Sequence, residues 1–292
     1  MAFRSPHEIA QLAAETGTKK VSLPLASVLV LGFLGGAFIS LGFLLDIRVT
    51  ANLPKDWGTF GSFLGAAVFP VGLMLIVIGG GELLTGNMMA VSMALFTGRI
   101  APLQLIINWL WITVSNLIGA LFVAYFFGHI VGLTEAGPFM DKTVAIAQAK
   151  LQDSFWQAFI SAIGCNWLVG LGVWLAYGAE DIGGKILGIW FPIMAFVAIG
   201  FQHVVANMFV IPAAIFAGHF TWHDYLLNFI PVYLGNAVGG GIFVSLIYFV
   251  AYKNHLFTIQ PEGSQEGEEW KDQRLQSRSM GRNMKLKPGR QS

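Results

Sequence analysis

Charged side chains are scarce in this sequence, and their scarcity excludes most soluble proteins. Asp, Glu, Lys and Arg together make up 11% of the 292 residues, whereas soluble domains contain roughly 25%. The single cysteine, Cys165, leaves no internal disulfide to form, and the sequence has no Cys or His cluster with the spacing of a metal site. A net charge of +1 gives no strongly basic surface for nucleic acid. We therefore expect neither a soluble enzyme nor a nucleic-acid-binding protein, and we predict no metal and no cofactor.

Apolar residues and glycine are abundant instead. Apolar types make up 55% of the chain, 35 residues are glycine, and the mean hydropathy is +0.65. Small residues allow helices to approach closely in lipid. A span in lipid must also satisfy its own backbone hydrogen bonds, which a helix does. The composition therefore predicts an all-α protein that crosses the membrane several times.

Six stretches are long enough to cross a bilayer, since each has the ~20 apolar residues that a membrane-spanning helix needs. They cover about residues 23–45, 60–96, 103–127, 155–177, 186–217 and 226–251. The second and fifth stretches are too long for one straight crossing. As a continuous helix, 60–96 would measure about 55 Å at 1.5 Å per residue, against a hydrocarbon core of ~30 Å. Each of these two helices must tilt strongly or break.

The polar ends of the chain complete the predicted domain organisation. Ser5 to Glu8 has the pattern of a capping box, which predicts an amphipathic helix within residues 1–22. Residues 23–252 form the six-helix transmembrane domain, and the polar residues 253–292 are expected to be a disordered tail.

Basic residues near the span ends predict the orientation. Six crossings put both ends of the chain on one side. That side has Arg4, Lys19, Lys20, Arg99, Lys185 and Lys253, and the other has Arg48, Lys55, Lys142 and Lys150. The positive-inside rule therefore places both termini in the cytoplasm.

Residues of the first half recur 120 positions later in the second half. The matched pairs are Asn87 with Asn207, Met88 with Met208, Asn108 with Asn228, Asn116 with Asn236, and Glu82 with Gln202. Each half contains three spans, so the second half enters the membrane in the opposite direction. This is the inverted repeat of many transporters and channels.

The two overlong stretches occupy matching positions in this repeat and contain matching interruptions. Residues 79–87 read Gly-Gly-Gly-Glu-Leu-Leu-Thr-Gly-Asn, and 200–207 read Gly-Phe-Gln-His-Val-Val-Ala-Asn. Polar, glycine-rich segments within apolar stretches predict broken helices. Non-helical backbone at membrane depth occurs only where protein covers it or water reaches it. The paired breaks therefore predict a translocation path.

Two ionisable residues, Glu82 and His203, fall at these breaks, and an ionisable group inside the membrane is a functional hypothesis by default. An imidazole titrates near neutrality, so His203 could exchange a proton with a passing weak acid. The alternative is a buried histidine that only hydrogen-bonds the interrupted backbone. We assign Glu82 a structural role, accepting hydrogen bonds from free backbone N–H groups. Thr85 either hydrogen-bonds a small solute or caps the second half-helix.

Three further polar residues are candidates near the breaks. Asn87 and Asn207 are interpreted as bridges between broken backbone ends, because a side-chain amide both donates and accepts. The ammonium of Lys150, before the fourth span, either attracts anions toward the centre or extends to the lipid headgroups.

Four motifs together resemble the formate/nitrite transporter family. They are Phe69-Pro-Val-Gly, Gly81-Glu-Leu-Leu-Thr-Gly-Asn, Cys165-Asn-Trp-Leu-Val and Phe201-Gln-His-Val-Val-Ala-Asn-Met-Phe-Val-Ile-Pro. The similarity covers about residues 1–252 and looks greatest to bacterial formate channels. It implies an aquaporin-like protomer with its own pore, a homopentamer, and a multi-pass location in the bacterial plasma membrane. It also implies transport of small monovalent anions or their acids.

The resemblance assigns roles to individual residues. His203 corresponds to the central histidine, Thr85 and Leu83 to the loop that breaks the second span, and Lys150 to the family's lysine. Asn166 and Asn207 match two family asparagines. Apolar constrictions are implied at Phe69, Leu73, Leu83 and Phe196.

One position departs from the family pattern, since Gln202 precedes His203 where the family usually has glutamate. A neutral amide does not favour a charged imidazolium as a carboxylate does, which puts in doubt any proton relay that needs an acid beside His203. Our hypothesis is that half-helix N-termini and Lys150 attract the anion and that His203 lends it a proton. The neutral acid then crosses the apolar rings, since an isolated charge is costly to bury.

The sequence leaves several functions open. It does not choose between formate, nitrite and hydrosulfide, and our choice of formate rests on overall resemblance. A neutral-solute pore for water or glycerol is disfavoured because the breaks lack the paired Asn-Pro-Ala motif of aquaporins. A membrane-embedded enzyme is not expected, because one histidine and one glutamate do not make a catalytic constellation.

Overall fold

The computed structural model describes residues 3–257, and its regular elements there are all helical. Six helices within this range are long and apolar enough to cross a membrane, as predicted. They span Leu25–Thr50, Thr59–Gly80, Pro102–Ile130, Phe155–Gly178, Ile182–Ile199 and Trp222–Leu256. The tail expected over 253–292 lies, from residue 258 onward, outside the described residues.

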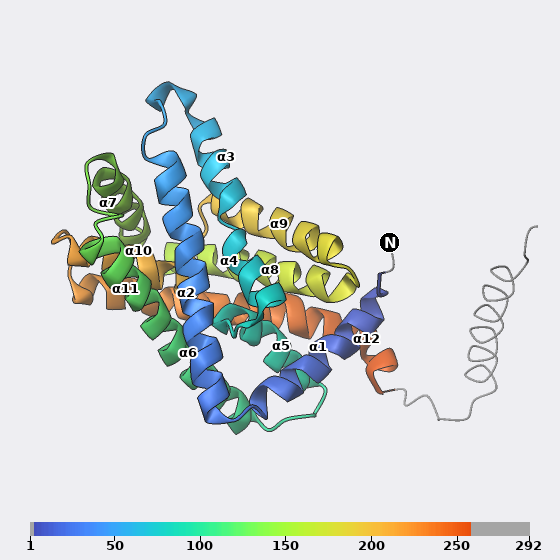
Figure 1. Cartoon of the computed structure of the whole chain (residues 1–292). Helices are drawn as coiled ribbons and strands as arrows, with labels where there is room; N and C mark the ends of the chain where they lie inside the picture. Colours follow the sequence, from blue (N-terminus) through green and yellow to red (C-terminus); the bar gives the residue numbers. More distant parts are fainter. Residues whose placement is uncertain (1–2, 258–292) are drawn as a thin grey trace, which may run out of the picture. The chain divides into compact units, whose positions relative to one another are not determined.

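Figure 1 shows the helices in chain order. They are α1 (Pro6–Val21), α2 (Leu25–Thr50), η1 (Lys55–Trp57), α3 (Thr59–Val68), α4 (Val71–Met74), η2 (Leu75–Gly80), α5 (Leu84–Phe96), α6 (Pro102–Phe122), η3 (Val123–Ile130), α7 (Pro138–Leu151), α8 (Phe155–Gly178), α9 (Ile182–Ile199), α10 (Val204–Phe216), α11 (Trp222–Val238), η4 (Gly239–Leu246) and α12 (Ile247–Phe257). Helix α7 lies between the third and fourth spans, where the sequence analysis predicted no element.

The second and fifth spans are broken, as their length requires. The helical stretch α3–α4–η2 ends at Gly80 and α5 begins at Leu84, while α9 ends at Ile199 and α10 begins at Val204. The breaks are shorter than the sequence suggested, covering 81–83 and 200–203. Gly80 and Gly200 have φ angles of 102° and 88°, in the left-handed region that glycine adopts at little cost. Both helices therefore end at a glycine in matching positions of the repeat.

The first and third spans of each half cross closely, so α2 packs on α6 and α8 packs on α11. At the first crossing, a Cβ on Gly36 would lie 1.9 Å from the carbonyl oxygen of Asn116. At the second, a Cβ on Gly235 would lie 2.2 Å from the carbonyl oxygen of Phe159. Both crossings therefore need glycine. The two halves pack in the same way, which supports the inverted repeat.

Helices α1 and α7 extend the repeat by one element in each half. Three residues separate each helix from the span that follows it. Helix α1 ends at Val21 and α2 begins at Leu25, while α7 ends at Leu151 and α8 begins at Phe155. Helix α1 packs on α5, and α7 packs on α10. The apolar stripe of α1 therefore packs against protein, with Gly17 close to the backbone of Ala90. Residues Lys20 and Lys150 consequently occupy corresponding positions beside the two breaks.

Candidate functional site

Two half-helices, α5 and α10, begin at the breaks, and the residues at their N-termini have matching backbone conformations. Leu83 precedes α5 with φ −110° and ψ 128°, and His203 precedes α10 with φ −115° and ψ 119°. A helix N-terminus carries partial positive charge from its free N–H groups. The repeat thus places an apolar side chain at one of these termini and an imidazole at the other.

The His203 ring is fixed by two hydrogen bonds. Its Nδ1 accepts from the backbone N–H of Ala206 at 3.0 Å, and its Nε2 lies 3.0 Å from the hydroxyl Oγ1 of Thr85. Because Nδ1 accepts, the proton of the neutral ring is on Nε2, which donates to Thr85. A second proton on Nδ1 would break the cap that His203 places on α10. The geometry therefore selects a neutral imidazole in the resting protein.

Aromatic rings cover the same point from the other broken span and from α9. The Phe196 ring stacks on the His203 ring with centroids 5.5 Å apart, and the Phe69 ring meets Phe196 edge-on at 5.6 Å. These rings help to line a narrow apolar gap that leaves essentially no room for a water molecule. It is lined by Ile39, Phe69, Leu73, Leu83, Val169, Ile193, Phe196 and His203. All four residues expected to form constrictions meet here.

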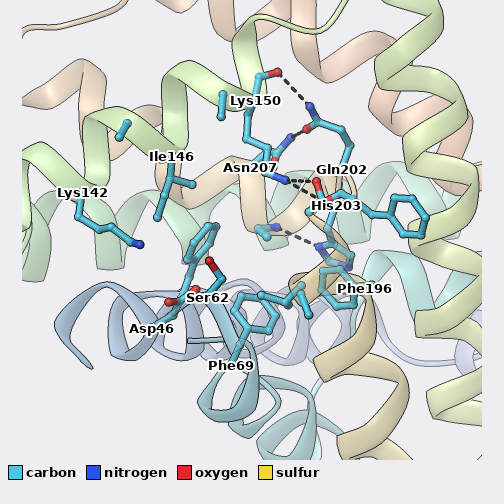
Figure 2. Close-up of a pocket in the computed structure, with 18 of the residues that line it drawn as sticks. Asp46, Ser62, Phe69, Lys142, Ile146, Lys150, Phe196, Gln202, His203 and Asn207 are labelled. Atoms are coloured by element: carbon cyan, nitrogen blue, oxygen red, sulfur yellow. Dashed lines mark hydrogen bonds between the residues drawn. The ribbon is translucent and has the colours of Figure 1, made fainter. Parts of the chain in front are cut away.

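A cavity of about 470 Å³ opens on one side of the gap. We call it the Lys150 cavity, because Lys150 lines it together with Asp46, Lys142, Asp153, Gln202 and Asn207. Figure 2 shows Phe69, Phe196 and His203 near one another, with Gln202 next to His203 and Lys150 farther toward the top of the view.

A second cavity, of about 310 Å³, includes Lys20, Glu82, Asn87, Leu73 and Leu83 in its lining. We call it the Lys20 cavity. The gap shares Leu73 and Leu83 with it, and shares Phe69, Phe196 and His203 with the Lys150 cavity. The three spaces therefore form one path that is closed at its centre.

Glu82 is held by side chains in the Lys20 cavity. Its Oε1 pairs with Nζ of Lys20 at 2.7 Å, and its Oε2 accepts from Nδ2 of Asn87 at 2.8 Å. Asn87 also donates to Asn108 at 3.1 Å. We expected Glu82 to accept from free backbone N–H groups, but it ion-pairs with a residue that precedes the first span.

The Lys150 cavity contains the matching network with an amide in place of the carboxylate. Asn207 donates to Oε1 of Gln202 at 2.7 Å and to Asn228 at 2.8 Å. Gln202 Nε2 donates to Asp153 at 2.7 Å and to the carbonyl of Lys150 at 3.0 Å. The repeat found in the sequence is therefore also a repeat of contacts.

Lys150 extends toward the break and not toward lipid headgroups. Its ammonium donates to the carbonyls of Gly200 and Phe201, at 2.9 and 2.8 Å. Burial lowers the pKa of this ammonium from its usual value, and the neighbouring Cys165 and Asp153 oppose that change. A cation therefore lies beside the free carbonyls at the end of α9.

Asn116 and Asn236 bridge the broken backbones, a role the sequence analysis assigned to Asn87 and Asn207. Asn116 accepts from the N–H of Leu84 at 2.9 Å and donates to the carbonyl of Glu82 at 2.8 Å. Asn236 accepts from the N–H of Val204 at 2.8 Å and donates to the carbonyl of Gln202 at 3.1 Å. The signal for both was their match in the 120-residue repeat.

Asn166 supports the path from behind. It donates to the backbone carbonyl of Thr85 at 3.3 Å and to that of Asn236 at 2.7 Å. It is fully buried and lines none of the three spaces. Its geometry thus orients the Thr85 backbone. Thr85 is likewise fully buried and reaches the path only through its hydrogen bond to His203, which lines the gap.

Comparison with known proteins agrees with this architecture. Residues 7–250 match the model of a family described as formate/nitrite transporter. The chain belongs to the formate/nitrite transporter family. The resemblance drawn from the sequence motifs is thereby confirmed. As a member of this family, the protein is a membrane channel and not an enzyme.

Two relatives and one solved structure show the extent of the similarity. The chain is 68% identical over 252 residues to an uncharacterized transporter, YrhG, of Bacillus subtilis (strain 168), covering 86% of this chain and 95% of that protein. It is 61% identical over 253 residues to the formate channel BtFdhC of Bacillus thuringiensis, covering 87% and 97%. A solved pentameric formate channel with formate bound superposes with a TM-score of 0.68 at 29% identity, covering 78% of this chain and 98% of that one. The predicted fold of the formate/nitrite transporters is confirmed.

Proposed function

We propose that this protein is a channel through which formate and related small monovalent anions cross the bacterial plasma membrane. The observation that carries the proposal is a single path in which two cavities, each with a lysine, meet at an apolar gap lined by His203, whose ring hydrogen-bonds the Thr85 hydroxyl. The 61% identical relative named as a formate channel supports formate in particular.

The arrangement in the membrane follows from the same proposal. Both termini face the cytoplasm, so the Lys20 cavity opens inward and the Lys150 cavity opens outward. The structurally similar formate channel is pentameric, which supports a homopentamer here. Large exposed apolar side chains on several spans, among them Ile106, Leu110, Leu227 and Ile230, are available to contact lipid or other protomers. The six-helix domain thus holds one path per protomer, with an α1 segment before it and a tail after it.

The proposed mechanism lets an acid cross where its anion cannot. Lys150 raises the local concentration of anions in its cavity, whereas the charge of Lys20 is paired with Glu82. Burial of a bare charge in the apolar gap is very costly, and removal of water raises the pKa of a carboxylic acid. The anion therefore takes up, at the end of the cavity, a proton that His203 has drawn from solvent. The neutral acid passes Phe69 and Phe196, and the anion forms again when the acid returns the proton to solvent in the cavity on the other side.

His203 is the proposed partner of the solute at this step. At rest its Nε2–H is a hydrogen-bond donor. To lend a proton it must first become an imidazolium, which breaks the bond from Ala206 to Nδ1. An unpaired buried N–H costs about 1–3 kcal/mol and the buried charge costs more, so the imidazolium forms only while the anion lies beside it. Transient protonation therefore suits a solute that must leave again quickly.

Uptake measurements on purified protein in liposomes test the proposed function. We expect rapid, saturable entry of formate and no osmotic swelling with glycerol, because the gap is narrow and apolar. Nitrite and hydrosulfide, tested one at a time, show whether the path accepts other small monovalent anions. Swelling with glycerol and no uptake of formate would instead establish a neutral-solute pore.

Replacement of the Thr85 hydroxyl tests whether it acts on the solute through His203. Thr85→Val keeps the shape of the side chain but removes the partner of His203 Nε2. We expect the formate flux to fall by roughly tenfold, the effect of losing about 1.4 kcal/mol of hydrogen bonding at the barrier. Initial uptake rates measure it, with Thr85→Ser as the control that keeps the hydroxyl. A Val variant with wild-type flux would assign the hydroxyl to packing alone.

A further inference from the structure

The two cavities match through the repeat but differ in where their negative charge lies. Glu82 in the Lys20 cavity corresponds to Gln202 in the Lys150 cavity. The three-residue links that follow α1 and α7 also correspond by position. Residues 22–24 read Ser-Leu-Pro, and residues 152–154 read Gln-Asp-Ser. Leu23 therefore matches Asp153. One half has its carboxylate at the break, and the other has an amide at the break and a carboxylate in the link.

The displaced carboxylate remains connected to the network at the break. Asp153 accepts a 2.7 Å hydrogen bond from Nε2 of Gln202, and the other end of this amide accepts from Asn207 at 2.7 Å. Asp153 and Gln202 both line the Lys150 cavity. A neutral amide thus stands between the carboxylate and the polar groups of the break.

The different position of the carboxylate changes which groups the ammonium of each lysine contacts. Lys20 forms a direct ion pair with Glu82 at 2.7 Å. The two hydrogen bonds of the Lys150 ammonium go to neutral carbonyls, and across residues 3–257 no carboxylate lies within ion-pair distance of it. An ammonium has three N–H donors, so one remains for a solute.

We propose that Asp153 is the counter-charge that sets the affinity of the Lys150 cavity for its anion, acting across Gln202 on the field around Lys150. The inference rests on the proposed function, because it concerns the anion that enters this cavity. A carboxylate paired directly with Lys150 would occupy the ammonium, as Glu82 occupies Lys20. Without any carboxylate nearby, Lys150 would hold the anion tightly and slow its passage. Asp153 is thus a positioning residue that tunes binding and does not itself contact the reacting proton.

Other charges face the same cavity and stay constant in the test. Asp46 and Lys142 line it at the end of α2 and on α7, and His203 lies at its inner end. None of them hydrogen-bonds Gln202, whose side-chain partners are Asp153, Asn207 and the Lys150 backbone. A change at Asp153 therefore alters one charge and leaves the rest of the lining intact.

The test uses variants that separate the charge of Asp153 from its hydrogen bond. Asp153→Asn keeps an acceptor for Gln202 but removes the charge. We expect the half-saturating formate concentration to fall by roughly fivefold to tenfold, because one repulsive charge is lost near the anion. Asp153→Asn combined with Gln202→Glu moves the carboxylate to the position that Glu82 holds in the other half. We expect this double variant to raise the half-saturating concentration at least to the wild-type value, because a carboxylate at this position pairs with Lys150 directly.

The controls separate this inference from general effects and from the proposed function. Asp141→Asn, which changes an exposed carboxylate on α7, the helix before the link that holds Asp153, should leave the half-saturating concentration unchanged. Formate uptake by the wild-type protein, measured alongside, tests the proposed function by itself. If the wild type transports formate and Asp153→Asn has the same half-saturating concentration, Asp153 is only a hydrogen-bond acceptor and the inference is wrong. A lowered concentration that the double variant does not restore would also overturn it.

Discussion

Formate uptake falls at least a hundredfold in a His203→Phe channel. The substitution removes the Nε2–H that meets Thr85 and the Nδ1 that caps α10 on Ala206, and it adds a third ring beside Phe69 and Phe196. A solute at the gap then has no polar partner, and two lost hydrogen bonds of about 1.5 kcal/mol each suffice for this factor. Initial rates in proteoliposomes at several pH values measure the change.

A matched variant separates proton transfer from hydrogen bonding at this position. Asparagine is a favoured residue at a helix N-terminus, so His203→Asn can accept from the Ala206 N–H and keep an amide donor at the gap, although this shorter side chain does not reach Thr85. If His203 only donates a hydrogen bond, this variant keeps much of the flux and the pH profile. If His203 lends a proton, both are lost as in the Phe variant. Wild-type flux and pH dependence in His203→Phe would remove the histidine from the mechanism altogether.

Asn236→Leu will destabilise the protein more than loss of a single contact would suggest. The amide of Asn236 pairs with the N–H of Val204 and the carbonyl of Gln202, the two ends of the break in the fifth span. Leucine leaves both groups buried and unpaired, at a cost of about 2–6 kcal/mol. Thermal unfolding of the solubilised protein and the yield of folded protein report the loss.

The two halves of the chain provide the comparison for this prediction. Asn116→Leu breaks the corresponding contacts to Leu84 and Glu82 and should cost a similar amount. Asn236→Asp in its protonated form keeps the acceptor for Val204 and a donor for one carbonyl, and should cost less than leucine. Leu234→Ala, at an exposed position on the same α11 helix, serves as the control. If Asn236→Leu unfolds at the same temperature as Leu234→Ala, the amide does not hold the break together.

The sequence by itself determined the spans, the breaks and the repeat. Hydropathy identifies membrane helices because lipid excludes unpaired backbone and charge, and two overlong stretches with glycine and polar residues had to break. The 120-residue repeat placed His203 and Thr85 at matching interruptions in opposite halves. The same repeat singled out Asn116 and Asn236 as a matched pair, but it did not show that they bridge the broken backbones.

Tertiary structure alone decided which polar groups meet. Lys20 and Glu82 are separated by 62 positions yet form an ion pair, and Gln202 finds Asp153 across 49 positions. Such partners depend on how α1 and α7 pack against α5 and α10, and no local pattern specifies that packing. The direction of the Lys150 side chain and the bridging roles of Asn116 and Asn236 also depend on how the helices pack together. In an apolar medium a buried polar group without a partner is costly, and only the assembled helices determine which partner lies within reach.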